Sequence, residues 1–192
     1  MAEESHVSWD EWLFRTVNGW AGRFEFLDWS MYEFSQEGNL LLPGILLVIY
    51  WSWTNWREAR IAGPSLALLI GLSDIVGGQL KLLIGRPRPC HVFAHIHELV
   101  GCGGTMSLPS NHAFNSATAA AFLHLLYPST GWIAWPLVGF IGLSRVYLGA
   151  HYVTDVFAGW ILGIILGGSA GFLLARSSWI GRGGTSSTHH PT

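Results

Sequence analysis

Charge is scarce in this chain of 192 residues, of which 11% are charged and 50% are hydrophobic. Soluble domains carry about a quarter charged residues, so this composition predicts a membrane protein. Lysine occurs once, as Lys81, and the formal net charge is −2. The sequence has no strongly basic cluster, which argues against nucleic-acid binding.

Cysteine is also rare. The two cysteines, Cys90 and Cys102, lie in one predicted loop, and from the residues alone they form either one disulfide or two separate thiols. The sequence pattern of a secretory signal peptide is not seen either. The N-terminal stretch MAEESHVSWDEW is acidic and has no basic region followed by an apolar one. We therefore expect no cleaved signal peptide.

Long apolar runs are what the chain does contain. A helix needs about 20 residues to cross a bilayer, and five segments are long enough or nearly so. Over residues 9–34, aromatic and aliphatic side chains recur at helical spacing among charges, which indicates one or two amphipathic helices at the membrane surface. We therefore expect an all-α integral membrane helical bundle with about five transmembrane helices, or six, and an N-terminal amphipathic segment. The expected spans are residues 39–56, 61–84, 111–127, 132–149 and 152–175.

This pattern divides the chain into three parts. Residues 1–37 are the amphipathic interfacial segment, residues 38–176 are the transmembrane domain, and residues 177–192 are a flexible polar tail. One connection, residues 85–109, is long and rich in Gly, Pro and His. Long loops in compact domains are usually functional.

Arginines without another evident role indicate the orientation. They follow the first span, at Arg57 and Arg60, and the last span, at Arg176 and Arg182. The positive-inside rule makes this side cytoplasmic. The long loop then faces the outer or periplasmic side of an inner membrane, where a Cys90–Cys102 disulfide is expected.

Polar residues converge on that outer face when the spans are counted. Arginine binds phosphate oxygens bidentately and lysine supplies a point charge. A serine that caps a helix marks an N-terminus that attracts anions. We therefore expect an anion site on this face, where Lys81, Arg86, Arg88, Ser110, Asn111 and Arg145 come together.

Two histidines indicate the chemistry. His151 and Asp155 are four residues apart, so they share one face of a helix. A carboxylate that fixes one ring nitrogen leaves the other available as nucleophile or base, and His112 on another helix can act as general acid. Metal ligation is the alternative role, but the neighbouring cations oppose a divalent ion. We therefore expect no metal and no cofactor.

Three motifs, KLLIGRPRP, PSNH and SRVYLGAHYVTD, resemble the signatures of the type 2 phosphatidic acid phosphatase (PAP2) superfamily. The resemblance implies that His151 is the nucleophile of a phosphohistidine mechanism, oriented by Asp155. It implies that His112 is the acid and base. It also implies that the phosphate is held by Lys81, Arg88 and Arg145, together with Ser110, Asn111 and nearby backbone N–H groups. Asn111 departs from the pattern, which usually has glycine there.

The resemblance implies a membrane lipid phosphatase, with residues 38–176 as the phosphatase domain. On this resemblance we expect undecaprenyl diphosphate as the substrate, because small members of this family often recycle carrier lipids. Lipid A 1-phosphatase, phosphatidylglycerophosphate phosphatase and phosphatidic acid phosphatase are alternatives. A non-catalytic binder or carrier of anionic lipids is the alternative of another class, and the oligomeric state is left open.

Other polar residues have simpler interpretations. We expect Arg86 to contact lipid phosphate rather than substrate, and Asp74 to hydrogen-bond within the bundle. His124 is expected to pack between helices. The glycines of GWILGIILGGSAG are expected to let helices approach closely. We expect His91, His95 and His97 to lie on a solvated loop rather than to bind zinc.

Overall fold

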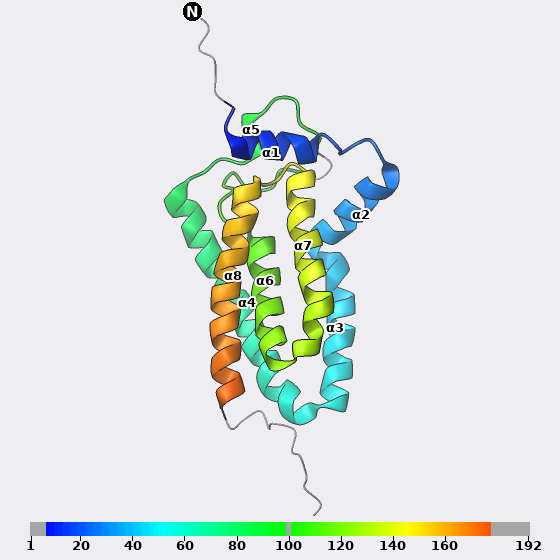
Figure 1. The fold of residues 1–192 in the computed structure, drawn as a ribbon, viewed down its shortest axis with the longest axis vertical. Coiled ribbons are helices and arrows are strands. Elements are labelled where there is room, and N and C mark those ends of the chain that lie inside the picture. Colours follow the sequence, from blue (N-terminus) through cyan, green and yellow to red (C-terminus); the bar gives the residue numbers. More distant parts are fainter. Residues whose placement is uncertain (1–6, 99–100, 178–192) are drawn as a thin grey trace, which may run out of the picture.

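A computed structural model describes residues 7–98 and 101–177 of the chain, and these residues form a bundle of helices (Figure 1). Within those ranges there is one isolated β-bridge, between Pro87 and Met106, and no β-strand. The expectation of an all-helical protein is therefore confirmed. The expected tail, residues 177–192, lies outside the described residues except for its first position.

Five helices form the body of the bundle. They are α3 (Glu37–Thr54), α4 (Trp56–Ile84), α6 (Asn111–Leu126), α7 (Gly131–Tyr147) and α8 (Val153–Arg176). Each begins and ends within a few residues of an expected span, except that α4 starts five residues earlier. Among the described residues, α4 and α8 are long and apolar enough to cross a membrane, whereas α6 and α7 have 16 and 17 residues. Five spans therefore stay a prediction.

Close packing of α6 against α8 forms the centre of the bundle. A Cβ atom added at Gly159 or Gly163 would lie 2.6 or 2.5 Å from a backbone oxygen of the segment that begins α6. Gly167 and Gly171 continue the same row at four-residue spacing. Only glycine permits this approach, so the expected role of the GWILGIILGGSAG glycines is confirmed.

Helix α1 (Trp9–Asn18) lies across the end of the bundle where α7 ends and α8 begins (Figure 1). Ser8 starts it by accepting a hydrogen bond from the Glu11 N–H at 3.2 Å. The helix buries Asp10, Phe14 and Asn18 and exposes Trp9 and Trp12, so it is amphipathic. Its position at a membrane surface stays a prediction.

Helix α2 (Glu25–Ser35) descends from α1 and packs against α7 (Figure 1). Phe34 of α2 stacks on Phe140 of α7 with ring centroids 5.6 Å apart. The long loop between α4 and α6 contains the short helix α5 (Pro89–Val92) and a disulfide between Cys90 and Cys102. The expected disulfide is therefore present.

Candidate active site

The helix ends that carry the three motifs lie at one end of the bundle, which is the end that α1 crosses (Figure 1). Lys81 lies in the last turn of α4, and Arg145 lies in the last turn of α7. His112 lies in the first turn of α6, and His151 precedes α8. The expectation that these groups share one side is confirmed.

Main-chain hydrogen bonds hold the motifs together. The Ser110 N–H donates to the Asp155 carbonyl at 3.0 Å, which joins the start of α6 to the start of α8. The His151 N–H donates to the Arg145 carbonyl at 3.2 Å. The turn between these two residues needs Gly149, whose φ of +82° is in the region that favours glycine. The position of His151 therefore follows from the helix ends.

His151 and Asp155 form a buried pair, with 1% and 0% of their surfaces exposed. Nδ1 of His151 lies 3.5 Å from Oδ2 of Asp155, at the outer limit of hydrogen bonding. Burial lowers the pKa of His151 to about 4, although Asp155 opposes this shift. The imidazole is therefore neutral at physiological pH, and Nε2 faces away from the carboxylate as a nucleophile would require.

Cationic side chains surround this pair. The charges of Arg88 and Arg145 act on both His151 and Lys81. Arg88 donates its Nε–H to the Met106 carbonyl at 3.2 Å. Burial lowers the pKa of the Arg88 guanidinium, which stays protonated at neutral pH. The three cations therefore form the positive field that a phosphate requires.

Ser35, at the end of α2, fixes Arg145. The guanidinium Nη1 of Arg145 hydrogen-bonds the Ser35 hydroxyl and lies 3.4 Å from the Ser35 carbonyl oxygen. The Ser35 backbone also interacts with His112. The N-terminal segment therefore contributes to the site as well as packing against the bundle.

The start of α6 differs in part from the expectation. Ser110 occupies the N-cap position, but its side chain makes no capping bond. Its hydroxyl is buried and has no hydrogen-bond partner among the described residues. The Asn111 side chain turns away and donates to Oδ1 of Asp74 at 3.2 Å. The Asn111 Oδ1 is buried and has no hydrogen-bond partner among the described residues, while the main-chain N–H of Asn111 lies in the first turn of α6, where helix N–H groups attract anions.

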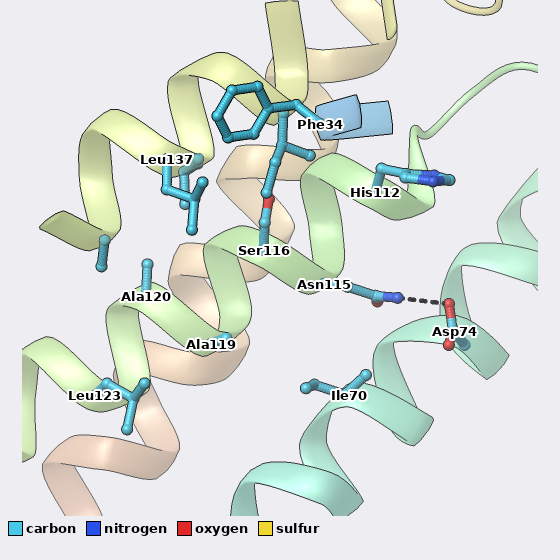
Figure 2. A pocket seen from close by; sticks show the side chains of 13 residues that line it. Phe34, Ile70, Asp74, His112, Asn115, Ser116, Ala119, Ala120, Leu123 and Leu137 are labelled. Atoms are coloured by element: carbon cyan, nitrogen blue, oxygen red, sulfur yellow. Dashed lines mark hydrogen bonds between the residues drawn. The ribbon is translucent and has the colours of Figure 1, made fainter. Parts of the chain in front are cut away.

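Asp74 has the structural role that we expected. Besides Asn111, its Oδ1 accepts a hydrogen bond from Asn115 at 2.8 Å (Figure 2). Asn115 in turn accepts one from Ser73 at 2.6 Å. The Asp74 carboxylate thus joins α4 to α6. His124 also behaves as expected, since its ring packs edge-on against Trp135 with centroids 6.4 Å apart.

The expectation that Arg86 contacts lipid phosphate is wrong. Its Nη1 donates to Asp155 Oδ1 at 2.8 Å, and its Nη2 donates to Asp10 Oδ2 at 2.6 Å. The guanidinium also lies 3.8 Å from the centroid of the Tyr152 ring. Sequence spacing missed these contacts because Arg86 and Asp10 are far apart along the chain.

An apolar pocket of about 540 Å³ adjoins His112 (Figure 2). It follows α6 from His112 to Leu123, a rise of about 16 Å at 1.5 Å per residue. Side chains of α4 and α7 form its other walls, and Phe34 of α2 also lines it. The polar lining groups besides His112 are Asp74, Asn115 and Ser116.

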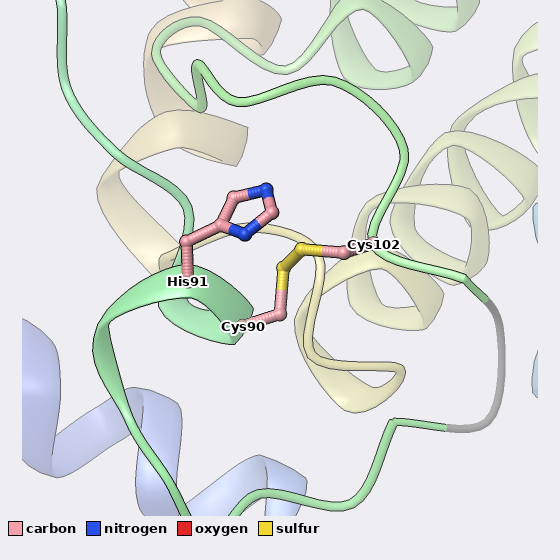
Figure 3. A group of neighbouring side chains, drawn as sticks. All are labelled: Cys90, His91 and Cys102. Atoms are coloured by element: carbon pink, nitrogen blue, oxygen red, sulfur yellow. A yellow bond between two sulfur atoms is a disulfide. The ribbon is translucent and has the colours of Figure 1, made fainter.

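One group among the described residues has the arrangement of possible metal ligands, namely Cys90, His91 and Cys102 (Figure 3). Its two sulfur atoms are joined in the disulfide and are not thiolate ligands. Of the other loop histidines, His97 packs against α1, because its N–H donates to Asn18 Oδ1 at 3.0 Å.

Several known proteins are similar to this chain in sequence or in fold. A lipid A 4'-phosphatase of Porphyromonas gingivalis is 26% identical over 88% of this chain and 75% of that protein. Undecaprenyl-diphosphatase BcrC of Bacillus subtilis is 29% identical over 86% of this chain and 82% of that protein. A crystal structure of a transmembrane PAP2-type phosphatidylglycerolphosphate phosphatase from Bacillus subtilis superposes with a TM-score of 0.66. That structure is 27% identical and covers 88% of this chain and 86% of its own.

The sequence model of the PAP2 superfamily matches residues 63–176, which contain all three motifs. These residues run from the first third of α4 to the end of α8, so they include every helix of the bundle body except α3. The resemblance inferred from the motifs is thereby confirmed, and the chain belongs to the PAP2 superfamily, in its branch of membrane lipid phosphatases.

Proposed function

We propose that this phosphatase removes the terminal phosphate of a lipid diphosphate through a phosphohistidine at His151, with undecaprenyl diphosphate as its substrate. The observation that carries the proposal is the buried pair of His151 and Asp155, surrounded by positive charge. A neutral, oriented imidazole among cations is suited to attack on phosphorus.

In the first step, Nε2 of His151 attacks the phosphorus while the bond to the leaving oxygen breaks. Asp155 orients the ring and stabilises its developing positive charge. His112 gives a proton to the leaving oxygen. In the second step, His112 accepts a proton from water, the water oxygen attacks the phosphohistidine, and the P–N bond breaks to release phosphate.

Binding of the phosphate is assigned to groups that stabilise negative charge in both steps. The Ser110 hydroxyl, which is buried and has no partner among the described residues, donates to a phosphate oxygen. The N–H groups of the first turn of α6, including that of Asn111, point toward the same anion. Lys81, Arg88 and Arg145 supply the positive charges, so the reaction requires no metal or cofactor.

The lipid chain lies in the pocket beside His112. The general acid must touch the leaving oxygen, so the leaving group lies on the His112 side of the site. The pocket begins there and runs parallel to α6, and its remaining walls are mostly apolar. The similarity to undecaprenyl-diphosphatase BcrC over most of both chains favours a polyprenyl diphosphate. The name of that relative does not by itself assign the substrate, so a substrate panel is required.

The site faces outward from a cytoplasmic membrane that the chain crosses five times. Arg57 and Arg60 lie near the start of α4, and Arg176 ends α8. These helix ends lie opposite to the site (Figure 1), as the positive-inside rule requires for cytoplasmic residues. The disulfide lies at the site end, which suits an oxidising compartment. After reduction, a membrane-impermeant maleimide should label Cys90 and Cys102 in intact cells or spheroplasts. Labelling only in inverted vesicles would reverse the orientation.

Phosphate release tests the function. Purified protein in detergent is given undecaprenyl diphosphate, lipid A, phosphatidylglycerophosphate and phosphatidic acid, each with and without a chelator. We expect the highest kcat/KM for undecaprenyl diphosphate, and a fall of at least about 10³-fold in His151→Ala and His112→Ala. Equal release by all three proteins would contradict the histidine mechanism. Loss of activity on chelation would assign the chemistry to a metal, and tight binding without turnover would favour a lipid carrier.

A further inference from the structure

We propose that Asp10 and Arg86 are positioning residues for catalysis, which connect the amphipathic helix α1 to the Asp155 carboxylate. This inference rests on the proposed roles of His151 and Asp155. Neither Asp10 nor Arg86 belongs to the phosphate-binding set. Their effect on the reaction would pass through Asp155.

The two oxygens of Asp155 have different partners. Oδ2 accepts the Tyr152 N–H at 2.8 Å and faces His151. Oδ1 accepts a hydrogen bond from the Arg86 guanidinium at 2.8 Å. The carboxylate plane is therefore fixed on one side by the main chain and on the other by Arg86. Removal of the guanidinium would leave Oδ1 buried without this donor, and the carboxylate could rotate away from the imidazole.

Arg86 is itself held at three points. Its Nη2 donates to Asp10 Oδ2 at 2.6 Å, its Nη1 donates to the Thr154 hydroxyl at 2.7 Å, and its plane lies over the Tyr152 ring. A planar guanidinium can make these contacts together, whereas a lysine ammonium has the wrong shape for them. The guanidinium is thus a rigid link between two carboxylates.

Asp10 also acts on α8 directly. Its Oδ1 accepts the Thr154 N–H at 3.1 Å, and its Oδ2 accepts the Thr154 hydroxyl. Thr154 lies in the first turn of α8, next to Asp155. A residue of α1 therefore caps the helix that carries the catalytic carboxylate, and its negative charge lies at the positive end of that helix.

The charges give Asp10 an electrostatic role in addition. One guanidinium lies between two buried carboxylates, with Asp10 6% exposed and Asp155 0% exposed. If Asp10 is neutralised, then of these two carboxylates only Asp155 still attracts the positive charge of the Arg86 guanidinium. Asp155 then becomes a weaker acceptor for the His151 ring when that ring gains positive charge.

Helix α1 has other contacts with the bundle besides those of Asp10. Phe14 is fully buried in a core with Val146 and Tyr152. Asn18 donates hydrogen bonds to the His97 and Tyr147 carbonyls at 2.9 and 2.8 Å. Asp10 is therefore not needed merely to hold α1 on the bundle. A buried carboxylate at this position costs free energy unless it is paired.

The test compares Asp10→Asn with Glu11→Gln, which removes the same charge from the next residue. Glu11 pairs with Arg15 outside the site. With farnesyl diphosphate in detergent as the probe, we expect Asp10→Asn to lower kcat about tenfold and to leave KM within about twofold. Glu11→Gln should leave both parameters within about twofold. A kcat equal in the two variants, or a change in KM alone, would overturn the proposal.

A double-mutant cycle tests whether Asp10 acts through Arg86. In an Arg86→Gln background, Asp10→Asn should lower kcat by about threefold or less, since only the direct hydrogen bonds from Thr154 to Asp10 are then left to lose. A full tenfold effect in that background would contradict the connection. Should Asp10→Asn not fold, as judged by thermal unfolding, Arg86→Lys takes its place, and a wild-type kcat in that variant would overturn the proposal. Wild-type turnover by His151→Ala would instead refute the histidine mechanism itself, whatever Asp10→Asn does.

Discussion

Nδ1 of His151 lies 3.5 Å from Oδ2 of Asp155, and both side chains are almost completely buried. The same carboxylate accepts hydrogen bonds from the Tyr152 N–H and from Arg86. Its position is therefore set before any substrate binds. Catalytic hydrogen bonds are often long without substrate and shorten in the complex, and here a small rotation of the imidazole would suffice.

Asp155→Asn should lower kcat by between about 10²-fold and 10⁴-fold, because an amide cannot stabilise the imidazole charge and can select the wrong tautomer. KM should change much less, since Asp155 does not contact the phosphate. Steady-state kinetics with a lipid diphosphate measure both parameters. Asp28→Asn is the matched control, because Asp28 bonds the Tyr147 hydroxyl at 2.6 Å outside the site. A kcat within tenfold of wild type would contradict the role of Asp155.

The pH dependence follows from the lowered pKa of His151, which is about 4. Only the neutral imidazole is nucleophilic, so activity is lost as the pH falls through this value and is not lost near 6.5. A phosphate monoester group titrates near pH 6. The rate of phosphoenzyme formation is therefore measured from pH 4 to 8. Phosphorus NMR measures the titration of the substrate phosphate, and the rate is corrected for it. A rate that falls with decreasing pH through an enzyme pKa near 6.5 would contradict the expectation, whereas a fall with increasing pH would report loss of the His112 proton.

Helix packing can be tested with two neighbouring glycines. A Cβ at Gly167 would overlap the Thr118 carbonyl, whereas a Cβ at Gly168 meets no atom within 4 Å. Gly167→Ala should destabilise the protein by about 1–3 kcal/mol by forcing α6 and α8 apart. Gly168→Ala should be neutral or slightly stabilising because alanine favours helix. Thermal unfolding in detergent compares the variants, and equal midpoints would argue against the tight α6–α8 contact.

The lipid pocket can be narrowed without touching the catalytic residues. Ala119 lines the pocket. Ala119→Leu should lower kcat/KM for undecaprenyl diphosphate about tenfold. The kcat/KM for a short, soluble phosphate ester should stay nearly unchanged. Ala67→Leu, on an exposed part of α4, is the matched control. An equal loss for long and short substrates would place the lipid chain elsewhere.

Much of the fold could be predicted from the sequence because long apolar runs between polar turns indicate the helices and their bounds. The helices α3, α6, α7 and α8 lie within a few residues of the expected spans. The bundle end that carries the site also followed from counting spans, since each motif residue sits at a helix end. The early start of α4 could not be read from composition, because a single residue, Asn55, separates it from α3.

The site could be predicted only where the motifs themselves contain its residues. The positions of His112, His151 and Asp155 are encoded by spacing, but the contacts of Asp10, Ser35 and Arg86 join segments far apart in the chain. Asp10 in SWDEW reads as an ordinary acidic residue in a first helical turn. Its burial, which depends on how α1 crosses the bundle, is what distinguishes it.

Trapping of the covalent intermediate tests the central claim most directly. Wild-type protein is mixed with a lipid diphosphate labelled in its terminal phosphate, quenched in alkali, and digested to locate the label. A histidine phosphoramidate survives alkali and is lost in acid, so we expect acid-labile label on the peptide that contains His151 and none on His151→Ala. Turnover by wild-type protein without any trapped label, or label that persists in His151→Ala, would contradict the mechanism.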